Sequence, residues 1–251
     1  MLKENSVIFV TGASDGIGRE LASQLSEKPY RIAAFARSKG KLADLESRVL
    51  KKSGVARVAG YICDVSDRSA VQASFLKAQE ELGVPDLLIA NAGIGRSFSA
   101  RRFEIETVEQ IHKTNVLGAI YCIEAVLPGM LERRSGHIAG ISSLAAYRSF
   151  PFNHTYCASK AALSAHLEGL RIELRKHGIK VSTICPGFIK TSMTDKNKHN
   201  MPFIMDVGKA AGLIIRAIEK DKKVYNFPWQ TMLLARASRL LPDKLVSRMN
   251  S

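Results

Sequence analysis

Tyr156 and Lys160 stand four residues apart, so they share one face of the helix expected over residues 156–176. A phenol is a poor base at neutral pH, because its reference pKa lies near 10. A nearby ammonium group favours the phenolate, and lowering that pKa by ~2–3 would require about 3–4 kcal/mol. The pair therefore predicts a group that gives or takes a proton at an oxygen of a bound molecule.

A glycine-rich loop, Thr11–Gly18, lies between an apolar run and a helical pattern. Gly12 suits a tight turn, Gly16 permits close approach of a pyrophosphate to the backbone, and Gly18 permits close contact of helix and strand. The free N–H groups and dipole of the following helix favour phosphate. The spacing is GxxxGxG rather than GxGxxG, and an ordinary strand-to-helix turn is the alternative.

The residues after the second apolar run bear on the choice of dinucleotide. An acidic residue there would bind the ribose 2′-hydroxyl of NAD, but Ala36–Lys41 contains none. The guanidinium of Arg37 suits a 2′-phosphate, and Ser38 adds a hydroxyl donor. We therefore expect NADP(H) to be preferred over NAD(H), with a solvated basic loop as the alternative.

The elements that must position these residues alternate along the chain. Apolar runs predict strands at Val7–Val10, Arg31–Ala36, Arg57–Cys63, Asp86–Ala90, His137–Ser142 and Lys180–Cys185. Helical spacing predicts helices at Arg19–Leu25, Leu42–Leu50 and Ser69–Leu82. Buried strands separated by helices indicate an α/β fold: a doubly wound parallel sheet (Rossmann fold) in a three-layer α/β/α arrangement, as a single domain over residues 1–251. Ligands of such folds bind beyond the carboxyl ends of the strands.

Composition narrows the class of protein. The 251 residues are 46% hydrophobic and 24% charged, which is typical of a soluble globular chain, and we identify neither a membrane-spanning run nor a signal peptide. The four dispersed cysteines and six histidines show no metal-ligand spacing, so we expect no metal and a cytoplasmic location. The net charge of +14 favours anionic partners without choosing among them.

Over roughly residues 5–195 the chain closely resembles the classical short-chain dehydrogenase/reductase family. The motifs that carry the resemblance are, in order, Thr11–Gly18, Asp64-Val65, Asn91-Ala92-Gly93, Asn115, Ser142-Ser143, the YxxxK pair of Tyr156 and Lys160, and Pro186-Gly187 followed by Thr191. Three positions depart from the family pattern: Asp15 stands where NADP-preferring relatives often have Lys or Arg, Ala90 replaces a common Asn, and Cys157 replaces a frequent Ser. Asp15 removes one possible phosphate contact and leaves Arg37 as the main discriminator between the dinucleotides. The changes at Ala90 and Cys157 touch no reacting group.

The resemblance implies an oxidoreductase that interconverts a carbonyl and an alcohol by hydride transfer. Tyr156 is then the general acid/base, Ser143 binds the reacting oxygen, Lys160 also binds the nicotinamide ribose, and Asn115 holds a water of a proton relay. Ser142 is expected to be structural. The implied cofactor-binding residues are Gly12, Ser14, Asp15, Gly16, Ile17, Gly18, Arg37, Ser38, Asp64, Val65, Asn91, Ala92, Gly93, Tyr156, Lys160, Pro186, Gly187, Ile189 and Thr191.

Other classes of function stay open at this point. A dinucleotide-binding regulator without activity is the main alternative, although it need not retain Ser143, Tyr156, Lys160 and Asn115 together. An epimerase or dehydratase of the extended relatives is disfavoured by the short chain and by the glycine spacing. We expect no nucleic-acid partner, since the basic charge is accompanied by no zinc finger, aromatic-basic motif or heptad.

The substrate side is expected in the later part of the chain. Residues 188–206 are polar and poorly periodic and predict a substrate lid, with Met193 in an adaptable apolar wall. A packed surface loop is the alternative. Together with Ser143 and Tyr156, Phe150 and His154 are expected to contact a small or lipophilic carbonyl substrate, His154 as a hydrogen-bonding group.

Two further contacts concern larger partners. Residues 228–251 form a basic amphipathic tail whose apolar side chains fit a membrane surface, a partner subunit, the chain's own core or the substrate pocket. The family resemblance implies a homodimer or homotetramer, paired through apolar positions expected on the outside of two long helices. These positions are Val116, Ile120, Ile123, Leu163, Leu167 and Leu170.

Overall fold

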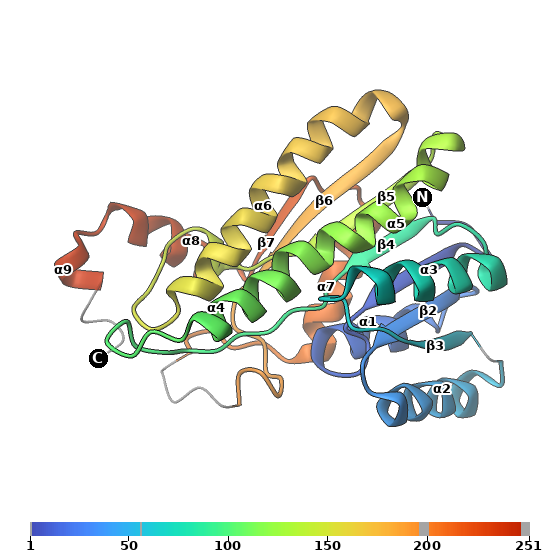
Figure 1. Ribbon diagram of the computed structural model, residues 1–251, viewed down its shortest axis with the longest axis horizontal. Helices are drawn as coiled ribbons and strands as arrows, with labels where there is room; N and C mark the ends of the chain where they lie inside the picture. Colours follow the sequence, from blue (N-terminus) through green and yellow to red (C-terminus); the bar gives the residue numbers. More distant parts are fainter. Residues whose placement is uncertain (1, 56, 196–200, 247–251) are drawn as a thin grey trace.

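The computed structural model describes residues 2–55, 57–195 and 201–246. Seven parallel strands form one sheet in the order β3-β2-β1-β4-β5-β6-β7 (Figure 1). Their bounds are β1 Val7–Thr11, β2 Arg31–Ala36, β3 Val58–Ile62, β4 Leu87–Ala90, β5 Gly136–Ile141, β6 Ile179–Pro186 and β7 Val224–Phe227. The chain order reverses on either side of β1, where a doubly wound sheet opens its binding crevice.

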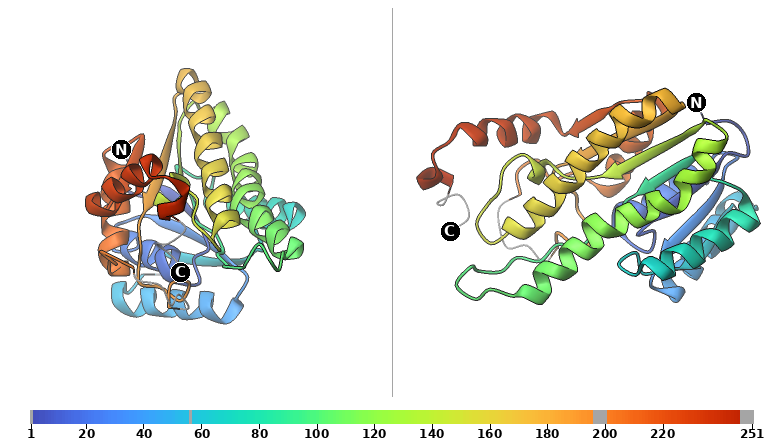
Figure 2. Two further views of the ribbon diagram at one scale, coloured as in Figure 1. Left: turned by 90° about the vertical axis from the view of Figure 1, so that its left-hand side faces the viewer. Right: turned by 45° about the horizontal axis from the view of Figure 1, so that its top comes forward.

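Helices cover both faces of this sheet, and Figure 2 shows the sheet between the two layers. One layer consists of α1 Gly16–Leu25, α2 Lys39–Ser53 and α7 Val207–Glu219. The other consists of α3 Arg68–Leu82, α4 Ile105–His112, α5 Gly118–Glu132 and α6 His154–Leu174. The predicted three-layer α/β/α fold is therefore confirmed. Shorter elements are the π-helix η1 Lys113–Leu117, the 3-10 helices η2 Leu144–Ala146, η3 Arg175–His177 and η4 Ser238–Leu240, and the tail helices α8 Trp229–Ala237 and α9 Asp243–Val246.

Each face of the sheet has its own hydrophobic core. On one face, Leu21 and Leu25 of α1 pack with Ile214 of α7 against the sheet. On the other, Phe9 and Phe75 belong to an aromatic group with ring centroids 5.5 Å apart. Because side chains of successive strand residues point to opposite faces, a strand without polar residues contributes apolar side chains to both cores.

The predicted element bounds differ from the observed ones mainly at helix starts. β2 has the predicted bounds, whereas α1 begins at Gly16 and α2 at Lys39, three residues earlier than expected in each case. Asp15 caps α1 and Ser38 caps α2 with a side-chain oxygen, which allows the first turn to form before the apolar pattern starts.

Three residues expected on outer helix faces lie in the core instead. Ile123 of α5 and Leu163 and Leu167 of α6 are buried against the sheet within one chain. Leu117 and Ile172 are the exposed large apolar side chains of this region. The helical periodicity of α5 and α6 was predicted correctly, but the apolar face that it identifies packs on the sheet. Association of two copies stays a prediction.

The continuous helical run Ile105–Glu132 is long and apolar enough, by length and composition, to cross a bilayer. It is the one such run among the described residues, and the sequence inspection had not identified it. In this fold its residues Cys122, Val126 and Met130 are buried in a sheet core.

The predicted lid is tied at its two ends. Ile189 and Met205 form a parallel bridge, in which the Lys190 N–H donates to the Met205 carbonyl at 2.9 Å. Residues 196–200 of the lid and 247–251 of the tail lie outside the described residues. The described part of the tail forms α8, η4 and α9 beyond β7 (Figure 1).

We predict that His137 of β5 makes the stability of the protein depend on pH. Its Nε2 lies 2.8 Å from Ser182 Oγ, and burial lowers its pKa from 6.5 to about 4. Between these values the unfolded chain binds a proton that the native chain does not, so the free energy of unfolding falls as the pH falls, by about 3 kcal/mol in all. His137→Gln should lose less stability than wild type between pH 7 and pH 4 in urea denaturation. Equal losses would contradict the prediction.

Candidate active site

A cleft of about 290 Å³ opens at the carboxyl ends of the strands. Most of the predicted site residues line it: Gly12, Ser14, Asp15, Gly16, Ile17, Arg37, Asp64, Val65, Asn91, Ala92, Gly93, Ser143, Tyr156, Lys160, Pro186, Gly187, Ile189, Thr191 and Met193. Gly18, Ser38, Asn115, Phe150 and His154 are not among its lining residues. The fold thus brings residues from distant parts of the sequence to one edge of the sheet.

Hydrogen bonds join the glycine-rich loop to the end of β4. The Thr11 hydroxyl accepts from the backbone N–H groups of Asn91 and Ala92, at 3.0 Å each. In return the Asn91 side-chain amide donates to the Thr11 carbonyl at 2.9 Å. Gly12 has a φ of +67°, which glycine adopts without steric cost. These contacts form the floor of the cleft.

Gly18 acts from behind the cleft rather than within it. A Cβ at this position would collide with the Gly12 carbonyl oxygen and with the side-chain amide of Asn91. The start of α1 therefore lies directly against the loop, so the N–H groups of its first turn face the cleft without intrahelical acceptors. An anion is stabilised at such a helix end.

Lys160 reaches the base of the cleft from α6. Its Nζ donates to the Ile141 carbonyl at 2.8 Å, and burial lowers its pKa to about 8. Ser142 supports this residue from behind, since its hydroxyl donates to the Lys160 carbonyl at 3.0 Å. Ser142 also lies 2.7 Å from Ser164 Oγ, so both of its contacts are structural ones.

Burial is the largest influence on the acidity of Tyr156 in the protein alone. Burial raises its pKa to about 12, and a hydrogen bond with Ser143 acts in the opposite direction. The Lys160 ammonium lies 5.8 Å from the centre of the tyrosine ring and is directed to the Ile141 carbonyl. Removal from water therefore outweighs the neighbouring charge, and the phenol is protonated at neutral pH.

Asn115 lies in the π-helical turn between α4 and α5 and is fully buried. Its Oδ1 accepts from the Ile94 N–H at 2.8 Å, and its Nδ2 donates to the Ile94 carbonyl and to Ser159 Oγ at 2.9 and 3.0 Å. A Cβ added to Gly93 would lie 3.3 Å from Asn115 Oδ1 and 3.4 Å from Lys160 Nζ. Glycine at position 93 thus leaves open the space between these two side chains.

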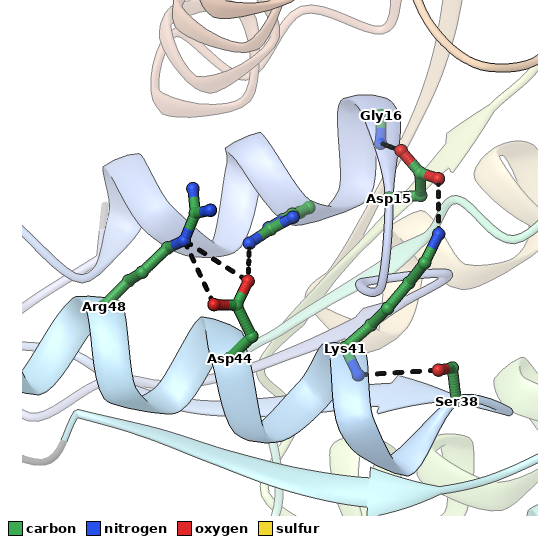
Figure 3. A network of polar contacts seen from close by, with 7 residues as sticks. Asp15, Gly16, Ser38, Lys41, Asp44 and Arg48 are labelled. Carbon is green, nitrogen blue, oxygen red and sulfur yellow. Dashed lines mark hydrogen bonds and ion pairs between the residues drawn. The ribbon is translucent and has the colours of Figure 1, made fainter.

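The edge of the cleft near Arg37 carries a cluster of charges. Arg37 lies 3.7 Å from Asp64, and both side chains are well exposed. Lys41, from the first turn of α2, donates to Asp15 Oδ2 at 2.8 Å (Figure 3). Lys41 is the main cause of a lowered pKa of Asp15, to which Ser192 also donates. Two cations therefore lie where the sequence indicated only Arg37.

Of the predicted substrate-wall residues Met193, Phe150 and His154, only Met193 lines the cleft. Met193 lines the cleft, and a Cβ at Gly95 would lie 3.5 Å from Met193 Sδ and equally close to the Tyr156 ring. His154 instead packs between two aromatic rings, 4.9 Å from that of Phe98. Its Nδ1 lies 3.2 Å from the Thr155 hydroxyl. Phe150 is likewise not among the lining residues, so contact of either residue with a substrate stays a prediction.

Several cleft residues were not predicted: Ala36, Cys63, Ile94, Thr114, Ile141, Ser142, Ser192 and Thr194. Thr194 shapes the start of the lid, because its hydroxyl donates to the Ile189 carbonyl at 2.7 Å and accepts from the Thr191 N–H at 2.9 Å. All of these residues except Ile141 adjoin predicted site residues in sequence, so extending each motif by one residue would have found seven of the eight.

A family model described as short chain dehydrogenase matches residues 6–202. The chain belongs to the classical short-chain dehydrogenase/reductase family. An uncharacterized oxidoreductase of Myxococcus xanthus (strain DK1622) is 39% identical over 237 residues, which are 94% of this chain and 93% of that protein. The ketoacyl reductase HetN of Nostoc sp. (strain PCC 7120) is 32% identical over 216 residues, 84% of this chain and 75% of that protein.

Solved structures of this short-chain dehydrogenase/reductase fold are similar over nearly the whole chain. A family member from Burkholderia phymatum in complex with NAD has a TM-score of 0.87 at 24% identity and covers 100% of this chain and 98% of its own. A short-chain dehydrogenase from Sphingobium yanoikuyae in complex with NADPH has a TM-score of 0.82 at 24% identity and covers 94% of this chain and 95% of its own. These likenesses establish the fold.

Replacing Gly18 with alanine should destabilise this short-chain dehydrogenase/reductase by about 1–3 kcal/mol, because the added methyl overpacks the contact between helix and loop. Gly40→Ala is the matched control. It lies in the first turn of α2, and a Cβ there meets nothing within 4 Å, so alanine should be neutral or stabilising by up to about 1 kcal/mol. Denaturant midpoints measure both variants, and a Gly18→Ala midpoint at or above that of Gly40→Ala would refute the overpacking.

Proposed function

We propose that the protein is an NADP(H)-dependent oxidoreductase that interconverts a ketone or aldehyde and an alcohol, with Tyr156 as the general acid/base. The observation that carries the proposal is the presence of Ser143, Tyr156 and Lys160 in the same cleft as the glycine-rich loop. The proton-transfer group Tyr156 and the phosphate-binding start of α1 then border the same cleft. Membership of an oxidoreductase family supports the same chemistry.

The residues of the cleft fit a dinucleotide. The Gly16 N–H donates to the Asp15 carboxylate, and the N–H groups that follow it in the first turn of α1 suit a pyrophosphate. Gly12 and Gly16, with φ of +67° and +51°, keep side chains out of its path. Asp64, Val65, Ile189 and Thr191 line the same cleft; the first two would contact the adenosine and the last two the nicotinamide. A nicotinamide cofactor bound there supplies the hydride, and the protein supplies orientation and the proton.

Tyr156 would donate its proton to the oxygen of a carbonyl substrate as the carbon is reduced. A pKa of about 12 keeps the phenol protonated at neutral pH, so reduction begins from the protonation state already present. Ser143, which hydrogen-bonds with Tyr156, would donate to the same substrate oxygen and stabilise its developing charge. Alcohol oxidation needs the phenolate and is therefore favoured at higher pH.

Lys160 and Asn115 would act behind Tyr156. The Lys160 ammonium is positioned by the Ile141 carbonyl and would bind ribose hydroxyls while returning a proton to Tyr156. Asn115 fixes the backbone of Ile94 on both its N–H and its carbonyl, which holds the loop over the gap beside Gly93. A water in that gap would link Lys160 to solvent.

The preference for NADP(H) rests on the cations at the edge of the cleft. Arg37 would pair with a 2′-phosphate, and Lys41, held over Asp15, adds a second positive charge from α2. Asp15 is thereby neutralised in a position where an unpaired carboxylate would repel the phosphate. We include in the proposal a small or lipophilic carbonyl substrate against Met193, and a homodimer or homotetramer as the assembly.

Arg37→Ala should weaken NADPH binding by about 10- to 100-fold and leave NADH binding within about threefold, since only the former carries the 2′-phosphate. Wild type should bind NADPH more tightly than NADH. Fluorescence titration of both cofactors measures this. Arg48→Ala, an exposed arginine farther along α2, is the matched control and should change neither affinity (Figure 3). Equal affinity of wild type for the two cofactors would refute the NADP preference.

Tyr156→Phe should lower the rate of carbonyl reduction by about 10²- to 10⁴-fold, because the general acid is lost while the ring that packs in the cleft remains. NADPH affinity should stay within about threefold of wild type. The measurement is NADPH oxidation with a panel of aldehydes and ketones, beside the cofactor titration. If wild type binds NADPH but reduces nothing in the panel, and the variant behaves identically, the protein is instead a dinucleotide-binding regulator.

A further inference from the structure

Helix α8 exposes large apolar side chains and buries Thr231. Trp229, Leu233 and Leu234 have 63%, 52% and 53% of their surface exposed. Thr231, on the side of the helix opposite Trp229 and Leu233, is buried, and among the described residues its hydroxyl has no hydrogen-bond partner. A helix on the surface of a water-soluble protein normally has the reverse arrangement, so the outward face of α8 is built to be covered.

The inward side of α8 is fixed to the body of the protein. A Cβ on Gly187 would lie 3.1 Å from the Thr231 methyl group, and Thr231 thus packs on the turn after β6. Arg236 is exposed, and its guanidinium lies 5.8 Å from the centre of the Tyr147 ring. Because the Thr231 contact sets the rotation of α8, Trp229 and Leu233 cannot turn inward without breaking it.

The apolar surface extends beyond α8 itself. A groove of about 590 Å³ runs from Trp229 to Phe203 and Ile204 of the lid, both of which are largely exposed. Leu240 and Leu241, after α8, are exposed as well. In Figures 1 and 2, α8 and α9 lie at one end of the long axis of the molecule, where a flat surface can reach them.

The charge of this surface is positive. No acidic residue occurs between Trp229 and Pro242, whereas Arg236 and Arg239 are exposed beside the apolar side chains. The first carboxylate that follows, Asp243, is paired with Arg148 at 2.6 Å. Tryptophan, leucines and arginines in this arrangement match the boundary between lipid headgroups and acyl chains.

We propose that the α8 surface, defined as Trp229, Leu233, Leu234, Arg236, Arg239 and Leu240, binds peripherally to a bilayer of anionic phospholipids. Apolar side chains enter the acyl boundary, and the arginines pair with lipid phosphates. A second copy of the chain fits less well at this surface, since a symmetric contact through it would bring the exposed Arg236 and Arg239 of both copies together. The proposal is independent of the reaction in the cleft.

Trp229 provides a direct test, because it is the only tryptophan of the chain. The full-length protein is mixed with vesicles of 30% phosphatidylglycerol in phosphatidylcholine, and with vesicles of phosphatidylcholine alone. We expect co-sedimentation and a blue shift of the Trp229 emission with the anionic vesicles. Binding should weaken by at least fivefold with phosphatidylcholine alone.

Two variants separate the apolar and the charged contributions. Leu233→Ser with Leu234→Ser should weaken partitioning by at least about tenfold, because two leucines no longer enter the acyl region. Arg236→Gln with Arg239→Gln should weaken it by about fivefold or more, and only with anionic lipid. Ile172→Ser and Arg175→Gln, both at exposed positions at the far end of α6, are the matched controls and should bind as wild type does. Thermal unfolding checks that all variants fold.

Three results would overturn the proposal. The first is absence of vesicle binding by wild type. The second is binding that the leucine pair leaves unchanged while Ile172→Ser abolishes it. The third is a Trp229 blue shift that depends on protein concentration and not on vesicles, with sedimentation velocity showing a larger species that the leucine pair dissociates. That outcome would identify a second copy as the partner.

Discussion

Parallel pairing of β1 between β2 and β4 is the constraint on which the rest of the site depends. Val10 lies opposite Ala34 on one side and Ile89 on the other, so the three strands finish at the same edge. In a parallel sheet every chain segment that leaves a strand's carboxyl end begins there. The glycine-rich loop, the Arg37 region and Asn91 therefore meet without being near one another in sequence. The Thr11 and Asn91 hydrogen bonds then fix the distance between two of these segments.

Burial governs the electrostatics of the cleft more than neighbouring charge does. It raises the pKa of Tyr156 to about 12 and lowers that of Lys160 to about 8, so both groups shift toward their neutral forms. The two pKa values, 10.0 and 10.5 for the ordinary groups, therefore lie farther apart in the cleft, with Lys160 as the stronger acid. Transfer of a proton from the Lys160 ammonium to a Tyr156 phenolate is favoured by this order.

The sequence was most informative for features that depend only on neighbouring residues in the same strand or loop. The strand at Arg31–Ala36, the sheet class and the segments around the cleft follow from local pattern, because buried parallel strands are continuously apolar. The role of Lys41 was not predicted, because its side chain acts through Asp15, which lies 26 residues earlier in the chain. The two residues meet only once α2 has folded beside the glycine-rich loop. The contacts of His154 with the Phe98 and Phe103 rings could not be predicted, because nothing in the local sequence shows that these residues meet. The faces of α5 and α6 were confused because periodicity identifies an apolar stripe, not the surface that covers it.

The π-helical turn η1 means that α4 and α5 are separately phased segments of one rod. A π turn holds one residue more than an α turn would, and each residue of an α-helix turns the chain by about 100°. Deleting a single residue between Lys113 and Leu117 would therefore let this turn close with α geometry while α5 keeps its rotation relative to α4. The same deletion within α5, before Cys122, would rotate Cys122 and Val126 away from the sheet, because no extra residue is present there to absorb it.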